Sequence, residues 1–153
     1  MLDDLYSARI LKAAAGLPHV GRLSAPQGSS EKVAKLCGSR IIVDLSLTDG
    51  RVTDFAQEVS ACALGQAAAS VLGENILGAT VEEIEAARAA LYEMLKSGGK
   101  PPAGRFSDLA MLEPVKDYAP RHASTMLAFE AAVEAARLAA TNASGRTTAA
   151  GAV

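Results

Sequence analysis

Residues 40–60 read RIIVDLSLTDGRVTDFAQEVS, and this stretch decides the fold. Its first half alternates between apolar and other side chains, which is typical of a strand with one buried face. The alternating apolar residues are Ile41, Val43, Leu45 and Leu47. Asp49-Gly50 favours a type I′ turn, because both central residues of that turn need a positive φ. The second half alternates less regularly, but the turn directs it antiparallel to the first. The sequence therefore predicts a β-hairpin over about 40–60.

Helices are expected after the hairpin. Residues 62–72 are rich in small helix formers and predict a buried helix. Thr80 and Glu83 have the spacing of a capping box, which indicates the start of a second helix. Pro120 fits the first turn of a last helix that runs to about Ala140. We therefore expect an α+β fold in which a small antiparallel sheet, built on the hairpin, packs against several helices.

The composition is that of one globular domain. The chain has 153 residues, of which 50% are hydrophobic and 21% are charged. A chain of this size buries enough surface to fold without disulfides or metals. We expect a single domain over 1–140 and a disordered tail over 141–153, where small and polar residues replace the apolar pattern.

The sequence argues against a nucleic-acid binder and against a membrane-spanning protein. The formal net charge is −2 and the Lys and Arg residues are scattered, whereas a nucleic-acid binder needs them clustered. No stretch approaches the about 18 apolar residues of a membrane span. The first fifteen residues show no signal-peptide pattern, so we expect a cytoplasmic protein in which thiols stay reduced.

The hairpin turn relates the two cysteines, Cys37 and Cys62. In a two-residue hairpin, the numbers of paired positions share one constant sum. A turn at 49 and 50 sets that sum to 99, and 37 and 62 also sum to 99. If the ladder continued that far, the two Cα atoms would lie about 4.5 to 5.5 Å apart. We therefore predict that both thiols lie at the open end of the hairpin.

Two neighbouring thiols suit a soft metal or an iron–sulfur cluster, because both take thiolate ligands. Cys62 also begins a predicted helix, where unpaired N–H groups and the helix dipole attract negative charge. His122 opens the last helix, where its imidazole could project toward the cysteines as a further metal ligand, whereas His19 lies in a loop without such an indication. Two alternatives stay open, namely two buried apolar cysteines or a disulfide.

These landmarks together resemble the NifU/IscU/SufU-type iron–sulfur cluster scaffold family, over roughly residues 5–140. The matching segments are LYSARIL at 5–11, PHVGRL at 18–23, CGSR at 37–40, CALGQAAAS at 62–70 and LEPVKDYAPRHASTMLAF at 112–129. The last segment is most similar to the SufU-type branch. The resemblance implies the family's fold, with Cys37 and Cys62 at two of its ligand positions.

Two other ligand positions are degenerate. Ser39 stands where the family has an aspartate ligand, and Ser124 falls where it has a third cysteine. A serine hydroxyl is a poorer metal ligand than a thiolate, because its proton is far less acidic. The family's usual site of three cysteines and one aspartate is therefore not expected to form.

The resemblance implies a scaffold or carrier rather than an enzyme. It would bind iron, an iron–sulfur cluster or zinc through Cys37 and Cys62, and its partners would be a cysteine desulfurase and other assembly proteins. His122 or a second copy of the chain would supply the missing ligands. The alternatives are a sulfur-transfer partner of the desulfurase, and a degenerate paralogue that only binds another assembly protein. Motifs for other enzyme chemistry are absent from the sequence.

Overall fold

The computed structural model describes the backbone of residues 6–36 and 38–152 and the side chains up to residue 142. Its elements are α2 (Ala8–Ala15), β1 (Gly28–Ala34), β2 (Ser39–Thr48), β3 (Arg51–Ser60), α3 (Ala63–Asn75), α4 (Val81–Ser97), the 3-10 segments η1 (Gly104–Asp117) and η2 (Ala119–Arg121), and α5 (His122–Ala152). The predicted α+β class, with an antiparallel sheet packed against helices, is confirmed.

The predicted hairpin is formed by β2 and β3. Asp49 and Gly50 have φ values of 54° and 77°, as a type I′ turn requires. Strand β1 pairs with the other edge of β2, so that the sheet of the described residues has the antiparallel order β1-β2-β3. Side chains of alternating position on β2 therefore face opposite sides of one sheet.

A β-bulge changes the register that we counted from the turn. Thr48 pairs with Arg51 as predicted, but the register shifts between Ser46 and Leu47, and Arg40 pairs with Ser60. Paired positions beyond the bulge therefore sum to 100 and not to 99. One extra residue of β3 enters the ladder at the bulge, so the constant sum of 99 from which we counted holds only between the turn and the bulge. Cys37 itself lies outside the described residues.

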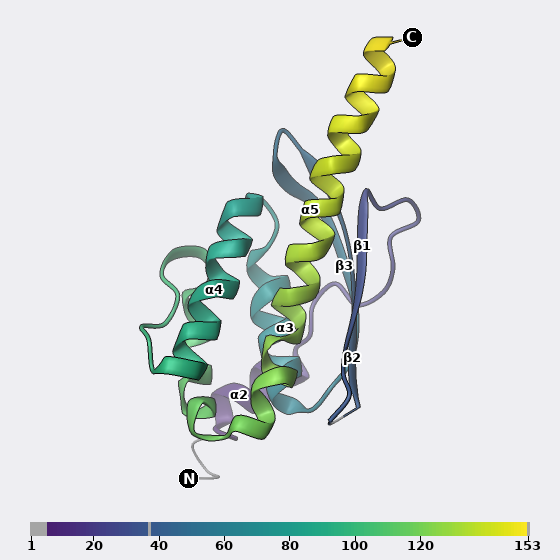
Figure 1. Cartoon of the computed structure of the whole chain (residues 1–153). Helices are drawn as coiled ribbons and strands as arrows, with labels where there is room; N and C mark the ends of the chain where they lie inside the picture. Colours follow the sequence, from purple (N-terminus) through teal and green to yellow (C-terminus); the bar gives the residue numbers. More distant parts are fainter. Residues whose placement is uncertain (1–5, 37, 153) are drawn as a thin grey trace.

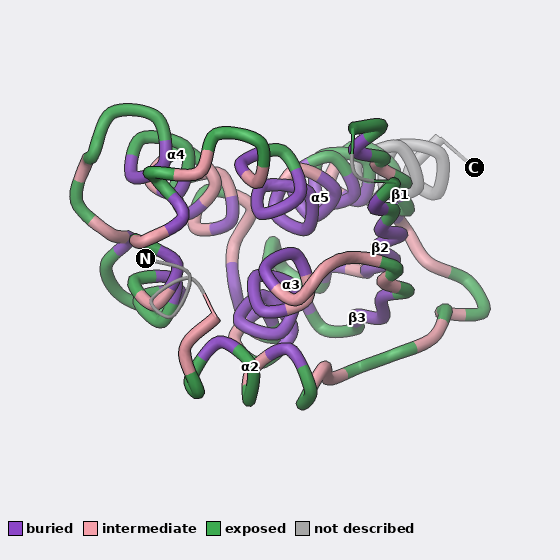
Figure 2. Tube along the Cα trace, turned by 90° about the horizontal axis from the view of Figure 1, so that it is seen from below, coloured by how far each residue is buried: buried purple, intermediate pink, exposed green. Residues whose placement is uncertain are grey.

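Helices cover one face of the sheet (Figure 1). Helix α5 packs on β1 and β2, α3 packs beside it, and α4 lies on the far side of α5 and contacts η1. Figure 2 shows the buried residues gathered between α3, α5 and the sheet. Gly28 permits this packing, because a Cβ at that position would lie 1.9 Å from the carbonyl oxygen of Ala135. The core therefore rests on a close approach of α5 to β1.

The loop between α2 and β1 crosses to the other face of the sheet. The backbone N–H of Gly21 donates to Gln57 O, and the N–H of Gln57 donates to His19 O, each at 2.9 Å. The Gln57 side chain is fully buried and donates from Nε2 to Pro18 O at 3.1 Å and to Ala69 O at 3.0 Å. These bonds fix the loop against β3.

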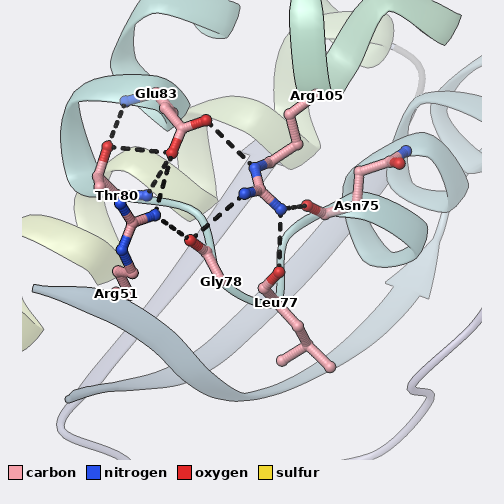
Figure 3. A network of polar contacts seen from close by, with 7 residues as sticks. All are labelled: Arg51, Asn75, Leu77, Gly78, Thr80, Glu83 and Arg105. Atoms are coloured by element: carbon pink, nitrogen blue, oxygen red, sulfur yellow. Dashed lines mark hydrogen bonds and ion pairs between the residues drawn. The ribbon is translucent and has the colours of Figure 1, made fainter.

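The capping box predicted for α4 is present. Thr80 accepts the N–H of Glu83, Glu83 accepts the N–H of Thr80, and Gly98 ends the helix with a φ of 68°. Arg105 in η1 ties this region together by donating to the carbonyl oxygens of Asn75, Leu77 and Gly78 and to Glu83 (Figure 3). The turn between α3 and α4 is therefore held by a cation from a distant segment.

The last helix differs from its predicted bounds. Pro120 lies in η2, α5 begins at His122, and its backbone stays helical to Ala152 and not to about Ala140. Alanine favours this extension, since it is the strongest helix former. Asn142 Nδ2 donates to Gln27 O at 2.6 Å and ties the helix to the sheet side of the molecule. The division into a domain over 1–140 and a tail over 141–153 stays a prediction.

None of the helices within residues 6–36 and 38–152 combines the length and the apolar content that crossing a bilayer requires.

Candidate functional site

Cys62 lies at the junction between the hairpin and α3. Strand β3 ends at Ser60, and Cys62 is the N-cap residue of α3, with an extended backbone and a partly exposed side chain. Its carbonyl oxygen accepts the N–H of Gln66 at 2.9 Å, which begins the helix. Its side chain forms no capping hydrogen bond. The thiol is therefore not used to start the helix.

Two serines complete a polar cluster around this thiol. Ser124 Oγ lies 3.1 Å from Cys62 Sγ and 3.4 Å from Ser39 Oγ. Ser124 comes from the first turn of α5 and Ser39 is the first residue of β2, with exposed fractions of 1% and 2%. The structure thus brings together the thiol and both serines that we predicted to stand at degenerate ligand positions. We call Cys62, Ser124 and Ser39 the thiol–hydroxyl cluster.

Gly65 allows the two helices to meet at this cluster. A Cβ at position 65 would lie 2.9 Å from Ser124 Oγ, 3.1 Å from Ser124 O and 2.9 Å from the Cβ of Ala61. Real Cβ atoms essentially never approach another heavy atom below 3.0 Å. The position of the Ser124 hydroxyl therefore requires a glycine at position 65 of α3.

Cys37 lies outside the described residues, so its predicted role as a ligand stays a prediction. Described residues flank it on both sides. Ala34 ends β1, and its partner in the ladder is Ser39, the first residue of β2. These two flanking residues therefore lie at the end of the sheet where Ser39 joins the thiol–hydroxyl cluster.

His122 is buried and held by η1. Its Nε2 lies 2.8 Å from Val115 O and 3.1 Å from Lys116 O, and because carbonyl oxygens only accept, Nε2 is the donor. In the neutral ring Nδ1 then has a free lone pair, and this atom is buried without a hydrogen-bond partner. A bare ring nitrogen with its other N–H fixed by a carbonyl is a form that metal sites use. Its predicted role as a ligand stays a prediction.

His19 has a different environment. It adopts a φ of 56° in the loop that runs along β3, and its ring lies edge-on to Phe55 with the ring centroids 5.9 Å apart. These contacts explain His19 as a packing residue of the loop.

Cys62 is the thiol that the described residues contribute to the site, and no group of three or more His, Cys, Asp or Glu side chains in that part of the chain could hold a metal ion. Ser39 and Ser124 add oxygen atoms that are buried and hydrogen-bonded. The described part of the site therefore offers one thiol beside two hydroxyls.

The sequence analysis missed a second polar centre, on the opposite face of β2. The fully buried carboxylate of Asp44 accepts from Arg22 Nε at 2.7 Å and Nη2 at 3.2 Å, from Ser29 Oγ at 2.6 Å and from the Leu23 N–H at 3.1 Å. Burial raises the pKa of Asp44, but these donors outweigh burial and hold the pKa below its ordinary value. The isolated Asp in the apolar alternation of β2 was the available signal.

The sequence and the fold of this chain are similar to those of known proteins. The chain matches the family model described as the NifU-like N-terminal domain over residues 5–125. The chain belongs to this family of iron–sulfur cluster assembly scaffolds. Among the relatives, the iron–sulfur cluster assembly scaffold protein IscU of Thermotoga maritima is 30% identical over 131 residues, which cover 86% of this chain and 92% of the relative. The resemblance found in the sequence is thereby confirmed.

Solved structures agree on the fold. The crystal structure of a nitrogen-fixing NifU-like protein (N-terminal) from Brucella abortus is 48% identical, with a TM-score of 0.89, and the alignment covers 92% of this chain and 97% of that one. A putative iron–sulfur cluster assembly scaffold protein for the SUF system from Fervidobacterium islandicum is 20% identical, with a TM-score of 0.80 and coverage of 88% and 98%. The second likeness concerns the fold alone.

Proposed function

We propose that this member of the scaffold family binds iron or an iron–sulfur cluster as its cargo through Cys37 and Cys62. The observation that supports the proposal most is the thiol–hydroxyl cluster, in which Cys62 lies 3.1 Å from Ser124 Oγ and Ser124 lies 3.4 Å from Ser39 Oγ. Three positions at which the resemblance to the family implies ligands thus lie together at one end of the sheet, and two of them hold serine in place of the ligand types that the resemblance implies.

The number of thiols determines how a cluster would be held. The chain has two cysteines, whereas a [2Fe–2S] cluster usually takes four thiolates. Two copies of the chain, each contributing Cys37 and Cys62, would supply that set. A single iron or zinc ion would instead need one further ligand from the chain, for which the bare Nδ1 of His122 is the candidate.

The proposed setting is the cytoplasm, with a cysteine desulfurase as the sulfur donor and other assembly proteins as further partners. Membership of the scaffold family supports an interaction with these proteins. A second function follows from the partial exposure of Cys62. A thiol that solvent reaches could accept a persulfide sulfur from the desulfurase. A third hypothesis is a degenerate paralogue that only binds another assembly protein.

The test is anaerobic reconstitution with ferrous iron and sulfide, followed by optical spectroscopy and metal analysis. The wild-type protein should develop thiolate-to-iron absorption, and Cys37→Ala and Cys62→Ala should lose it. The double variant Ser39→Asp/Ser124→Cys, which restores the family's ligand types, is the positive control and should bind metal more tightly than the wild type. Equal colourless spectra for the wild type and both alanine variants would reject the proposal.

The alternatives have their own readouts. Incubation with a cysteine desulfurase and cysteine, followed by mass spectrometry, should add one sulfur atom to Cys62 or Cys37 if the chain transfers sulfur. The paralogue hypothesis predicts metal-free protein after anaerobic purification, and stoichiometric iron or zinc would exclude it.

A further inference from the structure

A cavity lies where α2, the second half of α3 and η1 meet, away from the thiol–hydroxyl cluster at the start of α3. Its volume is about 380 Å³, which falls within the range of protein pockets that hold small molecules. Small residues of α2 and its C-cap leave this space open, because Ala13 and Gly16 both line it. Val71 of α3 and Met111 of η1 provide an apolar part of the wall. The cavity therefore has room for a ligand of amino-acid size with an apolar portion.

The charged residues of the cavity are divided by sign between its walls. The cations Arg9 and Lys12 belong to α2, whereas the carboxylates of Glu74 and Asp108 belong to α3 and η1. Arg9 and Asp108 form an ion pair at 3.4 Å, with side chains that are 63% and 60% exposed, and such an exposed pair contributes little to stability. The side chains of Lys12 and Glu74 form no ion pair and no hydrogen bond with any residue that the structure describes. One cation and one carboxylate on different walls are therefore available to a ligand.

Ser70 is the buried polar residue of the cavity. It is 4% exposed, and its hydroxyl makes no hydrogen bond within the described part of the chain. A hydroxyl at such a place is costly unless solvent in the cavity or a ligand completes its hydrogen bonds. Ser70 precedes Glu74 by four positions on α3, and residues four apart lie on the same face of a helix. The hydroxyl and the unpaired carboxylate therefore lie together on the side of α3 that lines the cavity.

We propose that this cavity binds a free α-amino acid with an apolar side chain. The ammonium group of the ligand donates to the Glu74 carboxylate and to Ser70 Oγ, and its carboxylate accepts from the Lys12 ammonium group. The apolar side chain contacts Val71 and Met111. A zwitterion matches walls of opposite sign, whereas a simple anion or a simple cation leaves one charged wall without a partner. The proposal is independent of the proposed function, since it uses neither cysteine.

The probe is L-leucine, titrated into the full chain and followed by isothermal titration calorimetry. Isocaproate keeps the leucine side chain but lacks the amino group, and isoamylamine keeps it but lacks the carboxylate. L-leucine should bind, and each analogue should bind about 10-fold more weakly or less, because each loses charge-assisted hydrogen bonds. In NMR spectra of isotope-labelled protein, the amide signals that L-leucine shifts should lie in α2, the second half of α3 and η1.

Two variants test the charged walls. Lys12→Gln and Glu74→Gln each remove one unpaired charge from an exposed residue, so the fold should be preserved and L-leucine should bind about 10-fold more weakly. The matched controls are Lys96→Gln and Glu93→Gln, which change the net charge equally at exposed residues of α4 outside the cavity. Both controls should bind L-leucine as the wild type does. Ser70→Ala should weaken binding by a smaller factor, because it removes one neutral acceptor.

The outcomes decide between a zwitterion site and its alternatives. If neither L-leucine nor a second probe, L-methionine, binds saturably, the proposal is rejected. Equal affinity for L-leucine and isocaproate would overturn the zwitterion and leave a simple anion site. A loss in Lys96→Gln as large as that in Lys12→Gln would also overturn the proposal, because it would assign the effect to net charge. None of these results bears on iron binding, which is measured through the two cysteines.

Discussion

At the residue scale, the buried carboxylate of Asp44 is the charge whose contribution to stability can be argued most directly. Its donors come from Arg22, Ser29 and the Leu23 backbone, so it links the loop before β1 to the middle of the sheet. Arg22 is half exposed, and its pKa is raised by the hydrogen bond and the charge of Asp44. The network therefore stabilises the loop that crosses the face of the sheet without helices.

Replacing Asp44 by Asn should destabilise the protein by about 2 kcal/mol at neutral pH, because it removes the charge that four hydrogen bonds stabilise. Urea denaturation measures this difference. The variant Glu31→Gln, which breaks an exposed ion pair with Arg40, is the control and should change stability by no more than about 0.5 kcal/mol. A loss in Asp44→Asn no larger than that of the control would contradict the argument.

The same carboxylate predicts a pH dependence. The pKa of Asp44 is lower in the folded state than its ordinary value of 3.8, so the folded protein holds its proton less readily than the unfolded chain. Its contribution to stability is complete above the unfolded pKa and is lost as the pH falls through the folded pKa. The stability difference between wild type and Asp44→Asn should therefore be constant near neutral pH and shrink below about pH 4. A difference that is unchanged between neutral and strongly acidic urea titrations would contradict this.

Sequence reasoning predicted which residues make up the thiol–hydroxyl cluster but not its hydrogen bonds. Ser39 and Ser124 were placed by the order of motifs that resemble the family. Their Oγ–Oγ distance depends on how closely α5 approaches β2 and α3, and that approach depends on Gly65. No local pattern contains this information, because packing distances between elements are set by side chains that are far apart in the sequence.

At the element scale, the hairpin and the capping box were predictable, whereas β1 and the bulge were not. The Asp49-Gly50 turn and the Thr80–Glu83 pair are local signals. The turn depends on the positive φ values of its own two residues, and the capping box depends on hydrogen bonds between its own two residues. Strand β1, with the sequence GSSEKVA, has few apolar residues to alternate. It is a strand because β2 on one side and α5 on one face supply its contacts, so tertiary packing overrides its weak propensity.

The close approach of α5 to β1 gives a prediction at this scale. Gly28→Ala would place a Cβ 1.9 Å from Ala135 O and 2.8 Å from Ala139 N, both backbone atoms of α5. Because backbone atoms cannot rotate away, the helix must shift, at a cost of about 3 kcal/mol. Denaturant unfolding measures the loss. Gly16→Ala, where the nearest atom lies 3.4 Å away, is the control, and a similar small change in both variants would contradict the packing argument.

The hydrogen bonds of Arg105 are expected to hold η1 against the turn between α3 and α4. Arg105 donates to Glu83, to the carbonyl oxygen of the last residue of α3 and to two carbonyl oxygens of the turn that follows it, and its side chain is 30% exposed (Figure 3). Arg105→Ala should cost about 1 to 2 kcal/mol and accelerate hydrogen exchange in residues 104–117. Arg88→Ala removes an exposed arginine whose ion pair with Glu130 is 3.9 Å long. That control should leave both measurements near the wild type, and unchanged exchange in Arg105→Ala would contradict the role of the network.

At the scale of the whole molecule, the fold places its candidate site at one end of the sheet. Cys62, Ser39 and Ser124 come from the end of the hairpin, the start of β2 and the start of α5. The helices cover one face of the sheet, and the loop before β1 crosses the other face. The Cys62 thiol, at the end of the sheet, is partly exposed. A partly exposed thiol at the end of the molecule permits a second chain to approach it.

The number of thiols then predicts the stoichiometry of a loaded protein. Two thiols per chain and four per [2Fe–2S] cluster require two chains for each cluster, or about one iron per chain. Reconstituted protein should therefore elute at twice the mass of the metal-free chain in size-exclusion chromatography with light scattering, and removal of iron by a chelator should return the mass to its starting value. Cys62→Ala should not change mass under the same conditions. Free thiols must be removed before the measurement, because an added thiol could replace the second chain as a ligand. A loaded protein that keeps the mass of one chain and loses its iron in His122→Ala would instead assign the site to a single chain, with the imidazole as the third ligand to one metal ion.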